Sequence, residues 1–259
     1  MNEIIQLNIL QFSLIYLLLI LVLILMKKSK ISQSKLLLLG TFRMSVQLVL
    51  AGFILTAVFE NPHPAFTVAY VAAMVIFSIT RILRKNPWLN RAFRWSVSLS
   101  LTLTGLFILG YFTQIVIGVS LFNPQYTIPL AGMIIGNAMT GITLALKTFH
   151  ESLTTGRSRM ETLLNLGASP KQILLPDVNR ALETALLPTM NSMLGMGIIA
   201  LPGMMTGQIL SGTSPSTAIL YQIAIMVAIT AAVCLAVFCS LHFGYRSLYN
   251  QRNQLDLPR

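Results

Sequence analysis

Charged residues are scarce in this sequence of 259 residues. Asp, Glu, Lys and Arg together make up 10% of the chain, and 55% of it is hydrophobic, whereas soluble domains carry about 25% charged residues. A chain this apolar cannot close around a single core in water, which excludes a water-soluble enzyme and a disordered tail. Cysteine is scarce too: Cys234 and Cys239 both lie inside an apolar run, where they are expected to pack rather than to form a disulfide scaffold. We predict an all-α integral membrane protein.

Acidic residues are especially rare, with 7 Asp and Glu against 18 Lys and Arg, which gives a formal net charge of +11. In a soluble protein such an excess suggests a nucleic-acid partner, but here the positions of the charges decide. The basic residues other than Arg43 fall in alternate connections between apolar runs or in the C-terminal tail: Lys27, Lys28, Lys30, Lys35, Arg81, Arg84, Lys85, Arg91, Arg94, Lys147, Arg157, Arg159, Lys171, Arg180, Arg246, Arg252 and Arg259. Cytoplasmic loops carry this kind of excess. We predict an amino terminus outside the cell, a cytoplasmic carboxyl terminus, and no nucleic-acid partner.

The apolar runs are long enough to cross a bilayer, which takes about 20 residues. We count about seven transmembrane helices, near residues 7–26, 36–58, 64–83, 95–121, 128–148, 184–204 and 216–243. Glycine and proline punctuate the sixth run, so it is expected to be a broken or re-entrant segment. We assign residues 1–259 to a single transmembrane domain, in which the stretch from about 149 to 183 is the only sizeable cytoplasmic element.

Two capping boxes predict short helices within this cytoplasmic stretch. Ser158 and Glu161 have the spacing of one box, which would start a helix at Arg159, and Gly167 is well placed to stop it. Ser169 and Gln172 repeat the box.

Prolines frame the second of these helices. Pro170 suits its first position, and Pro176 is expected to end it.

The first of these helices has an apolar stripe. Met160, Leu163 and Leu164 lie at i, i+3 and i+4, so they share one face of a helix that faces water. Such a stripe must be buried against its own protein, the lipid interface, or a groove in a partner.

The pattern of Glu161, Gly167 and the following Ala-Ser-Pro turn resembles the coupling loop of ABC-transporter permeases, the element between spans five and six that touches the ATPase. The whole chain, and above all residues 201–212 with the letters LPGMMTGQILSG, is similar to the FetB family of iron-export permeases. This resemblance implies a permease in the plasma membrane (the bacterial inner membrane) that exports iron or another metal ion. It also implies a separate cytosolic ATPase of the FetA type, with two copies of each subunit. The residues that it assigns to ATPase coupling are Ser158, Met160, Glu161, Leu163, Leu164, Gly167, Ala168, Ser169 and Pro170.

No glycine in the chain is followed by lysine, so the chain lacks the Gly-Lys-Ser/Thr turn that cradles nucleotide phosphates. We therefore expect no enzymatic activity and no bound cofactor in this chain. ATP and Mg would be used by the partner subunit.

Polar and sulfur-bearing residues inside the spans are candidates for a translocation path. Arg43 and Gln47 lie one turn apart on span two, on a face expected to turn inward, and Asn137 and Gln208 are further isolated amides. Thioethers suit soft metal ions, but methionine is also the usual filler of apolar interiors. The candidate methionines are Met193, Met196, Met204 and Met205. His63, His150 and His242 are far apart in sequence, so the identity of any metal site stays open.

Two Gly-x-x-x-Gly pairs predict close helix contacts, Gly132 with Gly136 and Gly203 with Gly207. These contacts could lie within the chain or against a second copy. A stand-alone secondary transporter would need acidic residues within the spans, where the chain has none, and a non-transporting membrane scaffold that recruits a cytosolic partner remains a further alternative.

Overall fold

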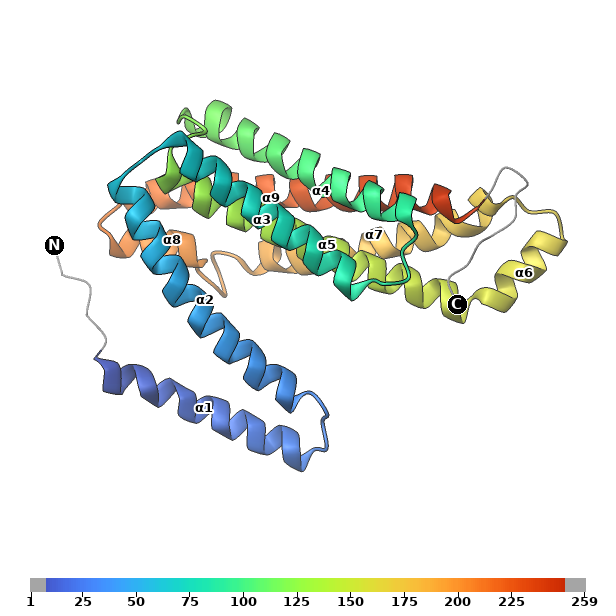
Figure 1. Ribbon diagram of the computed structural model, residues 1–259, viewed down its shortest axis with the longest axis horizontal. Coiled ribbons are helices and arrows are strands. Elements are labelled where there is room, and N and C mark those ends of the chain that lie inside the picture. The colour runs from blue at the N-terminus through green and yellow to red at the C-terminus, as the bar shows by residue number, and fades with distance from the viewer. Residues whose placement is uncertain (1–7, 250–259) are drawn as a thin grey trace. The chain divides into compact units, whose positions relative to one another are not determined.

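The computed structural model describes residues 8–249, and within them the predicted all-helical fold is confirmed (Figure 1). The long helices are α1 (Ile9–Lys28), α2 (Ser34–Glu60), α3 (Pro64–Lys85), α4 (Arg91–Tyr111), α5 (Pro124–Thr155), α7 (Pro170–Gly195) and α9 (Pro215–Gly244). The short ones are η1 (Phe112–Ile117), α6 (Arg157–Asn165), α8 (Gly203–Leu210) and η2 (Tyr245–Leu248).

Six of these segments are long and apolar enough to cross a membrane, so this is a multi-pass membrane protein. They are α1, α2, α3, α4 with η1, α5, and α9 with η2. The predicted count of seven is not confirmed, because the run at 184–204 is not one continuous helix. It divides into the end of α7, a turn that contains Gly197 at a φ of 82°, and the start of α8. This is the interruption that its glycines and prolines predict.

Helix α7 corrects one prediction. Pro176 does not end a short helix: it lies inside α7, which runs on for 26 residues and also contains Pro188. Each proline removes a backbone hydrogen bond, but packing on both sides of Pro176 holds the helix together. Ile173, Val178 and Ala181 are all buried against the core.

Two compact units make up the chain, one formed by residues 1–61 with 210–212 and the other by residues 62–209 with 213–259. In the first unit, α1 and α2 form an antiparallel pair, and the hydroxyl groups of Tyr16 and Ser45 are hydrogen-bonded at 2.9 Å. Most side chains of both helices are apolar, and nearly all of the described ones are exposed or half-buried, with Val58 the buried one on α2. Helices that are apolar all round are typical of lipid contact.

The second unit is a bundle in which α5 contacts α3, α4, α7 and α9. Small residues let α9 approach α5 closely: Ala138 and Ala145 are buried, and a Cβ atom on Gly141 would lie 2.7 Å from Cγ1 of Val233. Helix α9 packs against α4 just as tightly at Gly244, where a Cβ atom would lie 2.1 Å from the ring of Phe93. The core is therefore a set of close helix contacts around α5 and α9.

The basic connections of this second unit meet at one end of the bundle. The amide of Asn90, in the α3–α4 connection, donates a hydrogen bond to the backbone oxygen of Ser247 after α9 at 2.8 Å. Trp88, in the same connection, stacks on His150 near the end of α5, with ring centroids 4.7 Å apart. The connections that carry the basic residues thus lie together in space, as the alternation of charge predicts.

Candidate functional site

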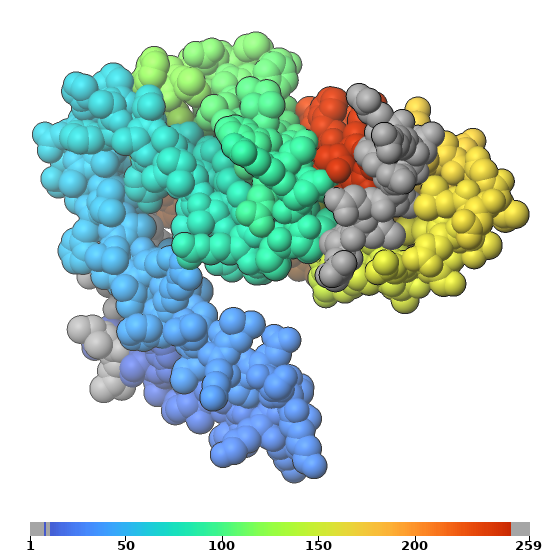
Figure 2. All heavy atoms as spheres, turned by 45° about the vertical axis from the view of Figure 1, so that its right-hand side comes forward, coloured from blue at the N-terminus to red at the C-terminus, as the bar shows by residue number. Residues whose placement is uncertain are grey.

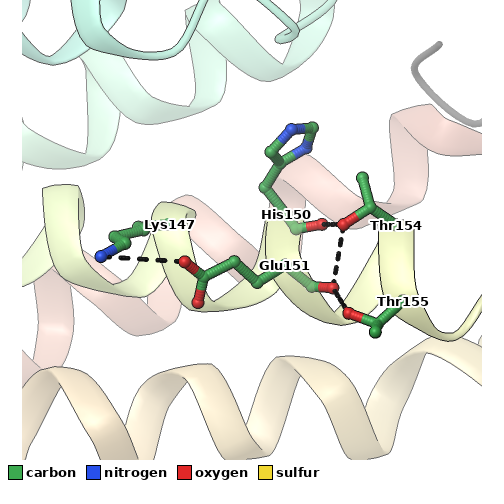
Figure 3. Close-up of polar contacts among 5 residues, drawn as sticks. All are labelled: Lys147, His150, Glu151, Thr154 and Thr155. Atoms are coloured by element: carbon green, nitrogen blue, oxygen red, sulfur yellow. Dashed lines mark hydrogen bonds and ion pairs between the residues drawn. The ribbon is translucent and has the colours of Figure 1, made fainter.

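The first candidate site is the elbow made by the end of α5, α6 and the start of α7. With 32 residues at 1.5 Å each, α5 is about 48 Å long, well above the roughly 30 Å of a bilayer's hydrocarbon core. At its last turns Lys147 pairs with Glu151 at 3.7 Å, and the hydroxyl groups of Thr154 and Thr155 donate to carbonyl oxygens one turn back (Figure 3). Side-chain hydrogen bonds and an ion pair thus lie along the last turns of a helix that is longer than the hydrocarbon core of a bilayer is thick.

Helix α6 begins earlier than predicted and without the predicted capping box. It starts at Arg157 after a joint of one residue, Gly156, and the Ser158 side chain makes no capping hydrogen bond. The reason is that the chain passes almost directly from α5 into α6, so that Gly156 rather than Ser158 is the residue that precedes the helix. Glu161 instead pairs with Arg157, at 3.1 Å.

The other predicted signals of the elbow are confirmed. Gly167 stops α6 with a left-handed φ of 86°, and its amide group donates to the carbonyl of Leu164. The amide of Ala168 donates to the carbonyl of Leu163, which completes the double hydrogen bond of a Schellman turn.

Helix α7 starts with the predicted capping box. Ser169 and Gln172 cap each other's amide groups, and Pro170 takes the first helical position. The elbow between α6 and α7 is thus a defined turn of two residues between caps on both sides.

An ion pair ties α6 to α7. The guanidinium of Arg159 lies 3.0 Å from the carboxylate of Asp177, whose side chain is 10% exposed against 57% for Arg159. Burial raises the pKa of Asp177, and the positive charges of Arg159 and Arg180 oppose that shift. Beside this pair is a groove of about 550 Å³, lined in part by Glu151, Arg159, Asp177 and Arg180. These contacts join α6 to α7 beside the groove.

The predicted coupling residues divide between an inner and an outer face of α6. Met160 is fully buried, and Leu163 and Leu164 are half-buried against the same core, so the apolar stripe covers its own protein, the first of the three alternatives. The outer face carries Ser158, Glu161 and Thr162 on α6 and Leu166 directly after it, all exposed. Helix α6 contributes to the yellow surface in Figure 2. Beyond Leu166, Gly167 is exposed, Ala168 and Ser169 are half-buried, and Pro170 is buried. Leu166 lies near the apolar stripe in sequence, but with 78% exposure it is not buried with the stripe.

The second candidate site is a pair of cavities beside α7 and α9. One, of about 470 Å³, is lined by methionines of α7, α8 and α9, and the other, of about 280 Å³, is lined by residues of α5, α7 and α9. Met196, Gln222 and Met226 line both cavities, so the two are neighbours.

The structure brings together part of the predicted path. Met193 and Met205 line the larger cavity, and Asn137 lines the smaller one. Met204 and Gln208 are half-buried on α8 without lining either cavity, while Arg43 and Gln47 are exposed on α2 in the other unit.

Two residues of α9 were missed by the sequence analysis. Gln222 is 3% exposed and Met226 lies one turn further along, both at the cavities. An amide within the apolar run 216–243 was the available signal for Gln222.

Among residues 8–249, no three His, Cys, Asp or Glu side chains come close enough to hold a metal ion.

The four glycines of the Gly-x-x-x-Gly pairs are not in tight contact within the described chain. A Cβ atom added to Gly132 would lie 3.6 Å from a methyl group of Met74, which is ordinary contact. A Cβ atom added to Gly136, Gly203 or Gly207 would have no neighbour within 4 Å. Contact of these glycines with a second copy stays a prediction. Gly141 on α5 and Gly244 on α9 are instead in tight contact with a neighbouring helix, and the place of Gly141 on the face of Ala138 and Ala145 was the available signal for it.

Comparison with known proteins places the chain among membrane proteins. A family model described as "Uncharacterised protein family (UPF0014)" matches residues 9–249. The UPF0014 membrane protein slr1647 of Synechocystis sp. is 35% identical over 215 residues, covering 82% of this chain and 83% of that protein. An Escherichia coli protein named "Probable iron export permease protein FetB" is 29% identical, and the match covers 88% of this chain and 87% of that protein. The Arabidopsis thaliana protein ALUMINUM SENSITIVE 3 is 32% identical, and the match covers 83% of this chain and 77% of that protein. No solved structure matches the chain. The predicted resemblance to FetB is confirmed.

Proposed function

Because the chain belongs to the UPF0014 family of membrane proteins, we propose that it is the membrane-spanning permease subunit of an ABC transporter, which exports iron or another metal ion across the plasma membrane. A separate cytosolic subunit of the FetA type hydrolyses ATP with Mg. Two copies of each subunit make the complex. The relative named as an iron export permease supports the metal cargo and the outward direction.

The α6 elbow is the observation that carries this proposal. An ATPase outside the membrane can drive a permease only through a rigid element that it can reach. Helix α6 is held to α7 by the Arg159–Asp177 pair and by the Schellman turn at Gly167. Its outer face is open around Leu166. Closure of two ATPase subunits would move α6, and through it α7, between inward-open and outward-open states.

The charge distribution supports a cytoplasmic position for this elbow. Lys147, Arg157, Arg159 and Lys171 surround it. The α3–α4 connection at residues 86–90, flanked by Arg84, Lys85 and Arg91, reaches the end of α9. Basic residues concentrate on the cytoplasmic side of membrane proteins. The amino terminus is then outside the cell and the carboxyl terminus inside.

The test is purification of the tagged full chain from native membranes, with Leu166→Asp as the variant. Leu166 is an exposed side chain, so its replacement leaves the fold intact but puts a charge on the docking face. Ile31, 48% exposed in the α1–α2 connection, offers the matched control Ile31→Asp. We expect an ABC-class ATPase to co-purify with the wild type and with the control, and to be lost with Leu166→Asp. Absence of any ATPase from the wild-type preparation would instead favour the scaffold or the secondary transporter.

A further inference from the structure

The methionines at the two cavities do not behave as simple packing residues. The hydroxyl of Thr230 lies 3.2 Å from the sulfur of Met193 and 2.8 Å from the carbonyl oxygen of Met226, either of which can accept its single proton. The side-chain amide of Gln222 donates to the sulfur of Met196 at 3.7 Å. Thr230 and Gln222 stand on α9, Met193 lies on the last turn of α7, and Met196 follows directly after that helix. These contacts orient the thioether sulfurs of Met193 and Met196 toward the polar side chains of Gln222 and Thr230 on α9.

Gln222 is the polar side chain that both cavities share. Its side chain is 3% exposed and lines both cavities, and its carbonyl oxygen Oε1 makes no hydrogen bond with any of residues 8–249. A buried acceptor without a partner costs about 1–3 kcal/mol, so an unpaired one in a native site requires an explanation, such as a bound ion. Seven residues of α9 precede it, which places Gln222 roughly 10 Å inside the end of that helix.

The lining of the cavities selects the chemistry of a ligand. Sulfur atoms come from Met193, Met196, Met205 and Met226 and, in the smaller cavity, from Met133, and the amides Gln222 and Asn137 and a few hydroxyl groups supply neutral oxygen. Among residues 8–249, no acidic, basic, histidine or cysteine side chain lines either cavity. Hard ions require several oxygen ligands with negative charge, and an uncompensated multiple charge in an apolar site is very costly. Thioethers select soft ions, of which Cu(I) is the biological example.

We propose that Gln222 and the methionines around it form a binding site for a soft monovalent metal cation of the Cu(I) class, lying on the transport route. This inference rests on the permease function proposed above and narrows its cargo. Gln222 lines both cavities, so an ion held there could pass from one cavity to the other. Neutral ligands hold the ion weakly, as release on the far side requires.

The test measures binding of Ag(I), a stable stand-in for Cu(I), to the purified full chain in lipid nanodiscs without any ATPase, by equilibrium dialysis and mass spectrometry of the metal. The variants are Met196→Leu and Gln222→Leu, because leucine keeps the volume of the methionine side chain. Met139→Leu is the matched control, since Met139 packs on the core and does not line the cavities.

We expect one saturable Ag(I) site in the wild type and in Met139→Leu. The two cavity variants should bind on the order of ten- to a hundred-fold more weakly, the range seen when support of a metal ligand is lost. Equal binding by all four proteins, or none by the wild type, would overturn the site. If Fe(II) stimulates ATP hydrolysis by the complete complex and Ag(I) does not, the proposed cargo class is wrong, while the proposed ABC permease function stands. If no ATPase partner is found but Ag(I) binds as expected, the permease function is wrong, while the binding site stands.

Discussion

Substitution of Gly167 by alanine separates the stability of the elbow from its role in coupling. Gly167 has a φ of 86° with no atom within 4 Å of an added Cβ, so the substitution brings strain without a clash. An L-residue in this conformation costs roughly 1–2 kcal/mol, and the lower entropy of the unfolded chain returns about 0.4–1 kcal/mol. The net loss is about 1 kcal/mol, or about 2–4 °C in Tm for a chain of this size.

Gly118 is a matched control for this experiment. It follows η1, also has a positive φ, of 76°, and also has free space around its Cβ position. Gly118→Ala should therefore lower Tm by the same few degrees. Only Gly167→Ala should reduce ATP-driven transport, by up to about five-fold, because about 1 kcal/mol changes an equilibrium by that factor.

The assay is thermal unfolding of both variants in nanodiscs, alongside metal efflux from cells that express the complete complex. Gly167→Asn should recover part of the transport, since asparagine tolerates the left-handed conformation. Equal transport by the two alanine variants would refute the reasoning, because loss of function would then follow stability alone.

Other substitutions test the remaining parts of the account. A double-mutant cycle on Arg159 and Asp177, measured by thermal unfolding, should give a coupling energy below about 1 kcal/mol because Arg159 is largely exposed. Each single variant should nevertheless lower transport. A coupling energy of several kcal/mol would contradict this prediction. Burial raises the pKa of Asp177 above 3.8, so the folded protein holds that proton more tightly than the unfolded chain. Stability should therefore fall as pH rises through this acidic range, and Asp177→Asn should remove the effect from a plot of unfolding midpoint against pH. Gly141→Ala should cost about 1–3 kcal/mol by crowding α9, whereas Gly136→Ala should be neutral or stabilising; equal midpoints would argue against the close α5–α9 contact. Pro176→Ala restores a helical hydrogen bond, so it should raise the unfolding midpoint, and unchanged transport would show that the proline has no part in coupling.

Helix identity could be predicted from the sequence wherever one local signal dominates. Apolar length predicted the six spanning segments, together with a seventh at 184–204 that the structure interrupts. The signals at Gly167 and Ser169 placed the turn between α6 and α7, because these signals depend on a few neighbouring residues. The Ser158 capping box failed because α5 continues to Thr155, so that α6 starts at Arg157 after the single residue Gly156 and Ser158 already lies inside the helix. Pro176 misled in the same way, since burial of α7 on both sides of the proline outweighs the lost hydrogen bond.

The site residues were harder to predict because they depend on which helices meet. Met193, Met196 and Met205 could be selected by type, but only the packing of α9 against α7 adds Gln222 and Met226 to them. Sequence periodicity also identified the stripe of Met160, Leu163 and Leu164 correctly as a face to be buried. It could not show that the protein's own core buries it, which leaves Leu166 and the polar side chains of the outer face for a partner.

The most direct test of the central claim is photo-crosslinking from the outer face of α6 in intact cells. A photoreactive amino acid replaces Thr162, exposed on α6, or Phe122, exposed in the connection before α5 at the other end of that helix. The account predicts that the probe at 162 is covalently trapped on a cytosolic ABC-class ATPase and that the probe at 122 is not. Trapping of an extracellular protein at 162, or of no ATPase at either position, would contradict it.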